Sequence, residues 1–399
     1  MTNAYIRDGR ARQFLVPVRV DGEIGSGTMA EQRKIRVAVV FGGRSSEHEI
    51  SCVTAGSVLS VIDADRYEVV PVGITRDGDW VLASGDPRRL AITDGRLPEV
   101  AGDGASLALP FSGGSGFLVV SPERVPQAIG EVDVVLPLLH GPFGEDGTLQ
   151  GLLEMMGARY AGSGVFASAA SMDKVFMKVL LAGQGIKVGP YVAVSDREWR
   201  RERKRILDDV AELGGVVFVK PARAGSSIGI SRVPDAADAE AVTAAIEAAR
   251  AHDPKVIVEA GISGREIECG VLESLDGGAP DVSLPAEIHV AEGFDFYDFE
   301  AKYLSSSRLT IPAELPTEVT ERIRGLAAAS FEAMGCEGLA RVDFFYGDDG
   351  EVYVNEINTL PGFTPASAFP QMWAASGLDY PALVDRLIQT ALRRSPGLR

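Results

Sequence analysis

Residues 341–359 have the sequence RVDFFYGDDGEVYVNEINT. Two apolar runs that favour strands flank the tight turn sequence GDDG, a pattern that predicts a β-hairpin. A turn centred on Asp348 and Asp349 places Asp343 opposite Val354. Because successive side chains of a strand point to opposite faces, this pairing decides which side chains share a face of the hairpin.

One face of the predicted hairpin carries several oxygen-bearing side chains. Glu356 and Asn358 share the face of Val354, and therefore of Asp343, if the strands pair in this way. A solvated face of a surface sheet would explain these polar groups. A divalent cation site would explain them too, because carboxylate and amide oxygens are hard ligands and leave open positions for phosphates. The hairpin alone leaves both interpretations open.

The composition is that of a globular protein with a large core. The chain has 399 residues, of which 46% are hydrophobic and 24% charged, enough for two or three domains. Its net charge of −17 argues against nucleic acid or an anionic membrane as the main partner. The charge leaves room for a small anionic ligand in a local basic pocket.

The cysteines indicate a reducing environment. Cys52, Cys269 and Cys336 are odd in number, far apart and without a C-x-x-C motif. We therefore expect no disulfide framework and a cytoplasmic protein. No apolar run approaches the length of a membrane span, and the N-terminus lacks the pattern of a signal peptide.

The first 33 residues show no clear hydrophobic period. We expect residues 1–33 to form a disordered leader, or the stretch before Met29 to be an over-extended start. The compact protein is expected to begin near Lys34, just before a strongly apolar strand.

The first half of the chain has the pattern of a parallel α/β domain. Strands are predicted over 36–41, 67–75 and 132–140, helices over 51–62 and 148–156, and loop-rich structure over 76–130. Ligand sites of such sheets lie beyond the carboxyl ends of the strands. Glu47 and His140 both fall at such ends, where each side chain is either part of a site or only solvated.

The second half contains a glycine–serine loop and paired acidic strands. The loop after Lys220 can cradle phosphate oxygens with its N–H groups, although it is not a Walker A motif. Helices are predicted over 171–183, 199–213, 317–335 and 381–394, and a Gly/Pro-rich loop over 359–370. Strands are predicted over 216–220 and, as two consecutive runs, over 255–274. Glu259 ends the first of those runs, and Glu266 and Glu268 share a face of the second. The basic helix over 199–213 suggests either an RNA contact or, as the acidic total favours, a solvated face.

Six segments together resemble the D-alanine–D-alanine ligases of the ATP-grasp superfamily. They are GGRSSEHEIS (42–51), HGPFGEDGTLQG (140–151), GSSIG (225–229), YDFEAKY (297–303), RVD (341–343) and NEINTLPG (355–362). The resemblance runs from about residue 35 to about residue 395. It implies an α/β protein with a three-domain ATP-grasp fold: an N-terminal α/β substrate domain over 34–162, a central ATP-grasp domain over 163–262 and a C-terminal ATP-grasp catalytic domain over 263–399.

The resemblance also implies a reaction. ATP phosphorylates the carboxylate of one D-alanine, the amine of a second D-alanine attacks the acyl phosphate, and the dipeptide serves peptidoglycan synthesis. Two anions must approach each other, so cations are required. Asp343, Glu356 and Asn358 match ligands of two Mg²⁺ (or Mn²⁺) ions. The positions that match ATP contacts are Lys174, Lys220, Glu259, Ala260, Ile262, Glu266, Phe296, Lys302 and Asn355.

The substrate residues follow from the same resemblance. Glu47 matches the group that binds the first ammonium, and His140 lies beside the first D-alanine. Arg341 and the backbone N–H of Gly362 match the groups that hold the reacting carboxylate and its oxyanion. The remaining matches are Ser226 and Tyr303, which join Glu47 in a lid-closing triad, and Ser367 with Lys302, which hold the second carboxylate. The Lys302–Tyr303 pair indicates D-alanine as the second substrate at neutral pH.

Some residues depart from the family pattern, and three other functions are alternatives to that of a D-alanine–D-alanine ligase. Ala260 stands where Lys is frequent, Ala224 where Glu is frequent, and Pro142 and Phe143 lie in the loop after His140. The rivals are an ATP-grasp ligase for another carboxylate, a non-catalytic nucleotide-binding regulator, and a calcium-binding protein that uses the GDDG segment. The last does not have EF-hand spacing. Family members are usually homodimers, so a homodimer is expected.

Overall fold

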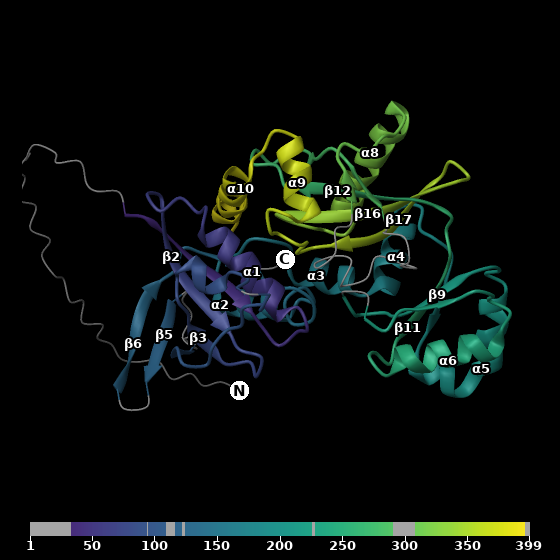
Figure 1. Cartoon of the computed structure of the whole chain (residues 1–399), viewed down its shortest axis with the longest axis horizontal. Helices are drawn as coiled ribbons and strands as arrows, with labels where there is room; N and C mark the ends of the chain where they lie inside the picture. Colours follow the sequence, from purple (N-terminus) through teal and green to yellow (C-terminus); the bar gives the residue numbers. More distant parts are fainter. Residues whose placement is uncertain are drawn as a thin grey trace, which may run out of the picture. The chain divides into compact units, whose positions relative to one another are not determined.

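The computed structural model describes residues 33–93, 95–108, 116–121, 124–225, 228–289 and 308–395. The predicted leader over 1–33 lies outside the described residues except for Arg33. Within Lys34–Arg399 the described strands form three sheets, each built from a successive part of the chain (Figure 1).

The first sheet has a parallel centre and an antiparallel extension. Its order is β6-β5-β4-β3-β2-β1-β7, and β1 pairs in parallel with both β2 and β7. The strands are β1 (Ile35–Gly42), β2 (Tyr67–Ile74), β3 (Trp80–Leu82), β4 (Ala105–Ala108), β5 (Gly116–Ser121), β6 (Arg124–Glu131) and β7 (Val134–Pro137). The helices of this part are α1 (His48–Leu59), the 3₁₀ turn η1 (Pro87–Leu90) and α2 (Thr148–Met156). The predicted α/β opening is therefore confirmed.

The prediction of loop-rich structure over 76–130 is wrong. Four strands, β3 to β6, pair there as an antiparallel meander. These strands are short or interrupted: β4 has only Leu107 as a large apolar residue, and β6 contains Pro126 and Gly130. Proline is acceptable in β6 because it is an edge strand. Such strands lack the alternating apolar pattern by which strands are recognised in a sequence.

The last helix closes the core of the first sheet. In α10 (Tyr380–Arg393), Leu383 and Leu387 are buried in the same cluster as Val37 of β1 and Leu136 of β7. Apolar burial of this kind is the main favourable term in such packing. The C-terminal helix thus stabilises the sheet that carries the first candidate site residues.

The second sheet is entirely antiparallel and covered by two helices. Its order is β10-β9-β11-β8, with β8 (Tyr191–Val194), β9 (Val217–Pro221), β10 (Ser231–Val233) and β11 (Val256–Ala260). The helices α5 (Asp196–Ala211) and α6 (Ala239–Arg250) pack together beside it (Figure 1). In α5, Arg205 pairs with Glu202 and Asp209 of the same helix, as expected for a solvated basic face.

The helix predicted over 171–183 is interrupted. The structure has α3 (Val165–Met172) and α4 (Lys174–Gly183), separated by Asp173 in an extended conformation. The Asp173 side chain accepts hydrogen bonds from the N–H groups of Val175 and Phe176, so it caps α4. This cap fixes where α4 begins, and hence where Lys174 lies.

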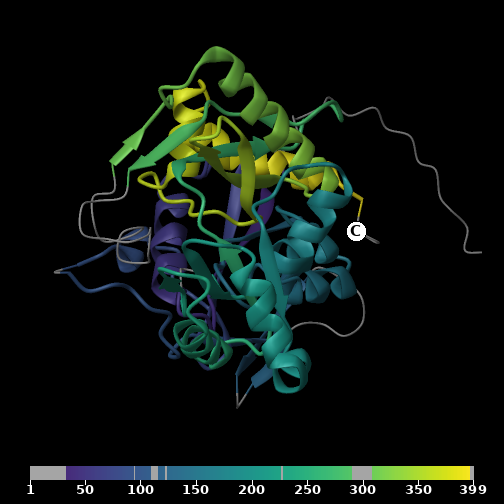
Figure 2. The same cartoon turned by 90° about the vertical axis from the view of Figure 1, so that its right-hand side faces the viewer.

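The third sheet carries the hairpin. Its order is β15-β14-β12-β16-β17, with β13 paired to β12. The strands are β12 (Gly264–Leu272), β13 (Asp281–Val282), β14 (Ala286–His289), β15 (Arg308–Thr310), β16 (Leu339–Gly347) and β17 (Val352–Asn358). Helix α8 (Thr317–Ala333) lies along this sheet (Figure 2). Helix α9 (Ala368–Ala375) begins inside the loop predicted over 359–370.

The predicted pairing of Asp343 with Val354 is wrong. Asp343 lies opposite Glu356, while Phe344 lies opposite Val354 in the apolar core. The turn is one residue longer than predicted, because Gly347 donates to the carbonyl of Glu351. A β-bulge between Asp343 and Phe344 then adds a second residue, Asn355, to β17. The two shifts keep Glu356 on the face of Asp343 and move Val354 to the opposite face.

Candidate active site

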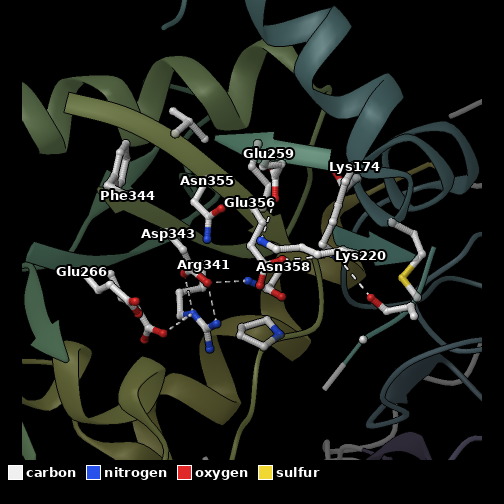
Figure 3. A pocket seen from close by; sticks show the side chains of 18 of the residues that line it. Lys174, Lys220, Glu259, Glu266, Arg341, Asp343, Phe344, Asn355, Glu356 and Asn358 are labelled. Carbon is white, nitrogen blue, oxygen red and sulfur yellow. Dashed lines mark hydrogen bonds and ion pairs between the residues drawn. The ribbon is translucent and has the colours of Figure 1, made fainter. Parts of the chain in front are cut away.

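A cavity of about 360 Å³ brings together most of the predicted site residues (Figure 3). Its lining includes the predicted residues Glu47, His140, Lys174, Lys220, Glu259, Ala260, Ile262, Glu266, Arg341, Asp343, Asn355, Glu356, Asn358 and Gly362. Ser367 is not in this lining; it stands before α9, with its hydroxyl 2.9 Å from that of Thr364. Ser226, Phe296, Lys302 and Tyr303 lie outside the described residues.

Arg341 and Asp343 form a fork on the hairpin face. Arg341 donates from Nε and Nη2 to the two oxygens of Asp343, both at 2.7 Å, and its Nε lies 3.2 Å from Oε1 of Glu268. Asn358 donates to the same Asp343 carboxylate at 2.9 Å (Figure 3). Burial opposes the charge of Arg341, but Asp343 and Glu268 outweigh burial and raise the pKa of the guanidinium well above its usual value.

The hairpin face is not a solvated surface. Asp343 is buried, and the side chain of Glu356 is 22% exposed and ion-paired with Lys174 at 3.4 Å. Lys174 also donates to the carbonyl oxygen of Ala224 at 3.2 Å, so residue 224 contributes through its backbone whatever its side chain. Of the two interpretations of this face, a site for cations and phosphates fits the burial and the basic partners.

The donor set of this face suits a partly open metal site. Among the residues that the structure describes, no group of three or more His, Cys, Asp or Glu side chains is arranged to hold a metal. Asp343 and Glu356 supply two carboxylates and Asn358 an amide, all from paired positions of β16 and β17. Mg²⁺ is commonly held by one or two carboxylates with substrate phosphates in the other positions. These residues fit such an ion.

Another part of the cavity lining holds a buried carboxylate between two lysines. Glu259, at the end of β11, lies 2.8 Å from Nζ of Lys178 and 2.6 Å from Nζ of Lys220 (Figure 3 labels the latter pair). Burial would raise the pKa of Glu259, but the two ammonium groups outweigh it and lower the pKa to about 2. Sequence reasoning missed Lys178, although it lies one helical turn after Lys174 and therefore on the same face of α4.

The loop that carries Glu47 is tied to the loop that carries His140. Ser45 donates to the carbonyl oxygen of His140 at 2.7 Å and accepts from the N–H of Glu47 at 3.2 Å. Gly141 has a positive φ of 72°, and a Cβ there would lie 2.4 Å from Oε2 of Glu47. The left-handed turn favours glycine, and a Cβ at this position would displace the carboxylate of Glu47.

Two further side chains of the 42–51 motif hold the same region. The Ser51 hydroxyl accepts from Gly42 N–H at 2.8 Å and donates to Leu138 at 2.7 Å, which joins the ends of β1 and β7. His48 contacts the carbonyl of Gly43 at 2.7 Å and accepts from the N–H of Val100. Serine and histidine in this motif are thus structural partners of the candidate site, which sequence reasoning did not foresee.

His140 lies in an acidic, buried environment. Its Nδ1 is 3.7 Å from Oε1 of Glu145 and 3.2 Å from the carbonyl oxygen of Leu360. Burial disfavours the imidazolium, but the carboxylates of Glu145 and Glu47 favour it, and the pKa of His140 is raised. A cationic histidine here would suit an anionic substrate group.

All three cysteines are free, in agreement with the prediction of no disulfide framework, and all three are buried. Burial raises the pKa of each thiol, at Cys52, Cys269 and Cys336, to about 12. Within the described ranges, no helix has the length and apolarity needed to cross a membrane.

Family models match both halves of the chain. The D-ala D-ala ligase N-terminus matches residues 36–163, and the D-ala D-ala ligase C-terminus matches residues 180–389. The chain belongs to the D-alanine–D-alanine ligase family. The family, the α/β ATP-grasp fold and the class of ATP-dependent ligase expected from the sequence motifs are thereby confirmed.

Similar proteins from this ligase family match nearly the whole chain. The D-alanine–D-alanine ligase of Kineococcus radiotolerans is 59% identical over 385 residues, which cover 93% of this chain and 100% of that one. The solved VanG D-Ala:D-Ser ligase from Enterococcus faecalis superposes with a TM-score of 0.76 at 34% identity, over 90% of this chain and 100% of that one. The D-alanine–D-alanine ligase from Bacillus anthracis complexed with ATP gives a TM-score of 0.64 at 27% identity, over 90% and 98% of the two chains.

Proposed function

We propose that this protein ligates two D-alanine molecules to D-alanyl-D-alanine, with ATP as the phosphoryl donor and D-alanyl phosphate as the intermediate. The observation that carries the proposal is the convergence of an arginine–carboxylate face and a lysine–glutamate wall on one cavity, in a chain of this ligase family. The product is a precursor for peptidoglycan. Such a reaction needs cations where two anions meet, and the cavity provides them.

Asp343, Glu356 and Asn358 are the residues that would hold two Mg²⁺ (or Mn²⁺) ions. Bound there, the ions would offset the negative charge of the ATP phosphates. Lys174 and Lys220 reach the cavity from α4 and β9 and would contact the phosphates. Glu259, Ala260, Ile262 and Glu266 line the part of the cavity at the β11–β12 junction, which suits the adenosine. Asn355, the extra residue of the bulge, lines the same cavity.

The first D-alanine is assigned to the part of the cavity lined by Glu47 and His140, which follow strands of the first sheet, and by Arg341 of the third sheet. Glu47 would accept from its ammonium group, and His140 would lie beside its carboxylate. Arg341 holds Asp343 with Nε and Nη2, so its remaining guanidinium N–H groups would donate to the substrate carboxylate and to the oxyanion that follows it. The backbone N–H of Gly362, in the same cavity lining, is a second donor for that oxyanion.

The finer assignments rest on the sequence. Ser367 and Lys302 are proposed to hold the carboxylate of the second D-alanine, and Ser226 and Tyr303 to close the site together with Glu47. The domain limits 34–162, 163–262 and 263–399 are kept as the proposed division. We also propose a homodimer.

The direct test is ADP release by the purified chain with ATP, Mg²⁺ and one amino acid substrate at a time. We expect turnover with D-alanine, with D-alanyl-D-alanine identified by mass, and none with L-alanine. D-serine and D-lactate, each mixed with D-alanine, test the second position. A mixed product formed faster than D-alanyl-D-alanine at pH 7 would overturn the proposed second substrate. Magnesium-dependent ATP binding without D-alanine turnover would favour an ATP-grasp ligase for another carboxylate, or a regulator.

A further inference from the structure

The carboxylate of Glu259 is shared between two lysines that differ in their access to the cavity. Lys220 approaches Oε2 at 2.6 Å and its side chain is 15% exposed. Lys178 approaches Oε1 at 2.8 Å and its side chain is only 2% exposed. The three groups therefore form a buried cluster in which one negative charge faces two positive charges.

If the ammonium group of Lys220 contacts the phosphates of ATP while it stays 2.6 Å from Glu259, its single positive charge is divided between the two anions. If Lys220 turns to the phosphates, Glu259 keeps a counter-charge only through Lys178. A carboxylate left buried without a partner is strongly destabilising, more so than the loss of an exposed ion pair. Lys178 can prevent this, because its ammonium contacts the other carboxylate oxygen, Oε1, and its side chain on α4 is buried.

We propose that Lys178 is a positioning residue for nucleotide binding: it holds and neutralises Glu259, and so releases Lys220 to the phosphates of ATP. The inference rests on the proposed use of ATP at this cavity. It gives Lys174 and Lys178, one turn apart on α4, different tasks. The first contacts Glu356 and the Ala224 carbonyl on the phosphate side, and the second sets the charge state of the adenosine side.

The surroundings of Lys178 support a fixed position. Its ammonium lies 5.9 Å from the centroid of the Tyr191 ring, within the range of a cation–π contact. Tyr191 belongs to β8, which pairs with β11 so that Tyr191 lies opposite Glu259. The aromatic ring and the carboxylate thus hold the same ammonium from two neighbouring strands, whereas Lys220 also lies close enough to Glu356 and Glu266 to interact with their charges.

The test measures nucleotide affinity of the full chain without D-alanine, by calorimetry with a non-hydrolysable ATP analogue and Mg²⁺. We expect Lys178→Met to weaken binding at least tenfold, and Lys178→Arg to stay within about threefold of the unchanged protein. In turnover, Lys178→Met should raise KM for ATP and leave KM for D-alanine at saturating ATP within twofold. Lys187→Met, which removes an exposed lysine paired with Glu351, is the matched control and should change neither value.

The role through Glu259 is tested in a Glu259→Gln background. There the carboxylate charge is gone, so adding Lys178→Met should cost less than twofold in affinity. An equal loss in both backgrounds would overturn the inference, as would unchanged affinity in Lys178→Met with a lowered melting temperature. If Lys178→Met alone does not fold, the affinity of Lys178→Arg and the difference between Glu259→Gln and Glu259→Gln/Lys178→Met still test the inference. Because binding is measured without D-alanine, failure of the proposed ligation would show separately, as absent turnover in the unchanged protein.

Discussion

Asp343 lies directly opposite Glu356 across β16 and β17, because Asn355 is an extra residue in β17. In a regular hairpin with the observed turn, Asn355 would face Asp343 and Glu356 would point into the apolar core. The bulge therefore gives two neighbouring strands one acidic face without breaking the packing of Phe344 and Val354 on the other. Bulges next to active sites commonly re-aim a side chain in this way.

We expect Glu356→Gln to reduce ADP formation at saturating D-alanine at least 100-fold, since the change removes one of the two carboxylates that are proposed to hold the metal ions. The affinity for nucleotide should lose its dependence on Mg²⁺, which calorimetry with and without EDTA can measure. Glu351→Gln, on the same hairpin but exposed and paired with Arg322, is the control and should stay close to the unchanged protein. Equal Mg²⁺ dependence in the unchanged protein and Glu356→Gln would contradict a metal role for Glu356.

The catalytic efficiency with D-alanine should fall more when Arg341 is replaced than when its partner Glu268 is replaced. Lysine cannot reproduce the two hydrogen bonds at 2.7 Å to Asp343, so we expect Arg341→Lys to lower kcat/KM for D-alanine at least 100-fold. Glu268→Gln leaves that fork intact and should cost about tenfold, on the order of 1.4 kcal/mol. Steady-state kinetics with D-alanine varied at saturating ATP gives both values. The reverse order would mean that Glu268, not Asp343, sets the position of Arg341.

Ser45 should matter for the first substrate although it is not in the cavity lining. Ser45→Ala removes the 2.7 Å hydrogen bond that holds the carbonyl of His140, and we expect KM for D-alanine to rise about fivefold. The free energy of unfolding should fall by about 1 kcal/mol, the usual value of such a bond. Ser57→Ala removes a serine hydroxyl bond to Val53 within α1, which leaves the carbonyl of Val53 with its helical partner, so it is the control and should change neither KM nor stability appreciably. A rise in KM in both variants would argue for a general loosening of α1.

Elements with a strong hydrophobic period could be predicted from the sequence. β1, α2, α8 and α10 lie where their apolar residues indicate. The meander over 76–130 could not be predicted from the sequence, because β4 and β6 are stabilised by pairing with neighbouring strands that are themselves irregular. The pairing of Asp343 with Glu356 could not either, since a bulge depends on how both faces of the sheet pack, and no local pattern marks Asn355.

The candidate site shows a similar division. Residues whose side chains carry the chemistry, such as Arg341 and Glu356, stand in motifs and were found. Residues that act by holding others were missed: Ser45 and Ser51 hydrogen-bond to backbone groups about 90 positions away, and Lys178 of α4 pairs with a carboxylate of strand β11. Such contacts exist only after the chain has folded, and serine or lysine at an ordinary helix or loop position gives no signal of them.

Glu259 predicts a specific dependence of stability on pH. Its folded-state pKa of about 2 lies below the ordinary value of 4.5, so its ionised form stabilises the fold at pH above about 4.5. That contribution, about 3 kcal/mol for a shift of this size, is lost as the pH falls from about 4.5 towards 2. Urea unfolding of the unchanged protein and of Glu259→Gln between pH 3 and 7 measures it. The stability difference between the two should be largest near pH 7, shrink steadily below pH 4.5, and persist in 0.5 M NaCl, because buried pairs are screened little. A difference that stays constant with pH would mean that Glu259 is not the paired, ionised carboxylate described above, and would also remove the basis for the role of Lys178.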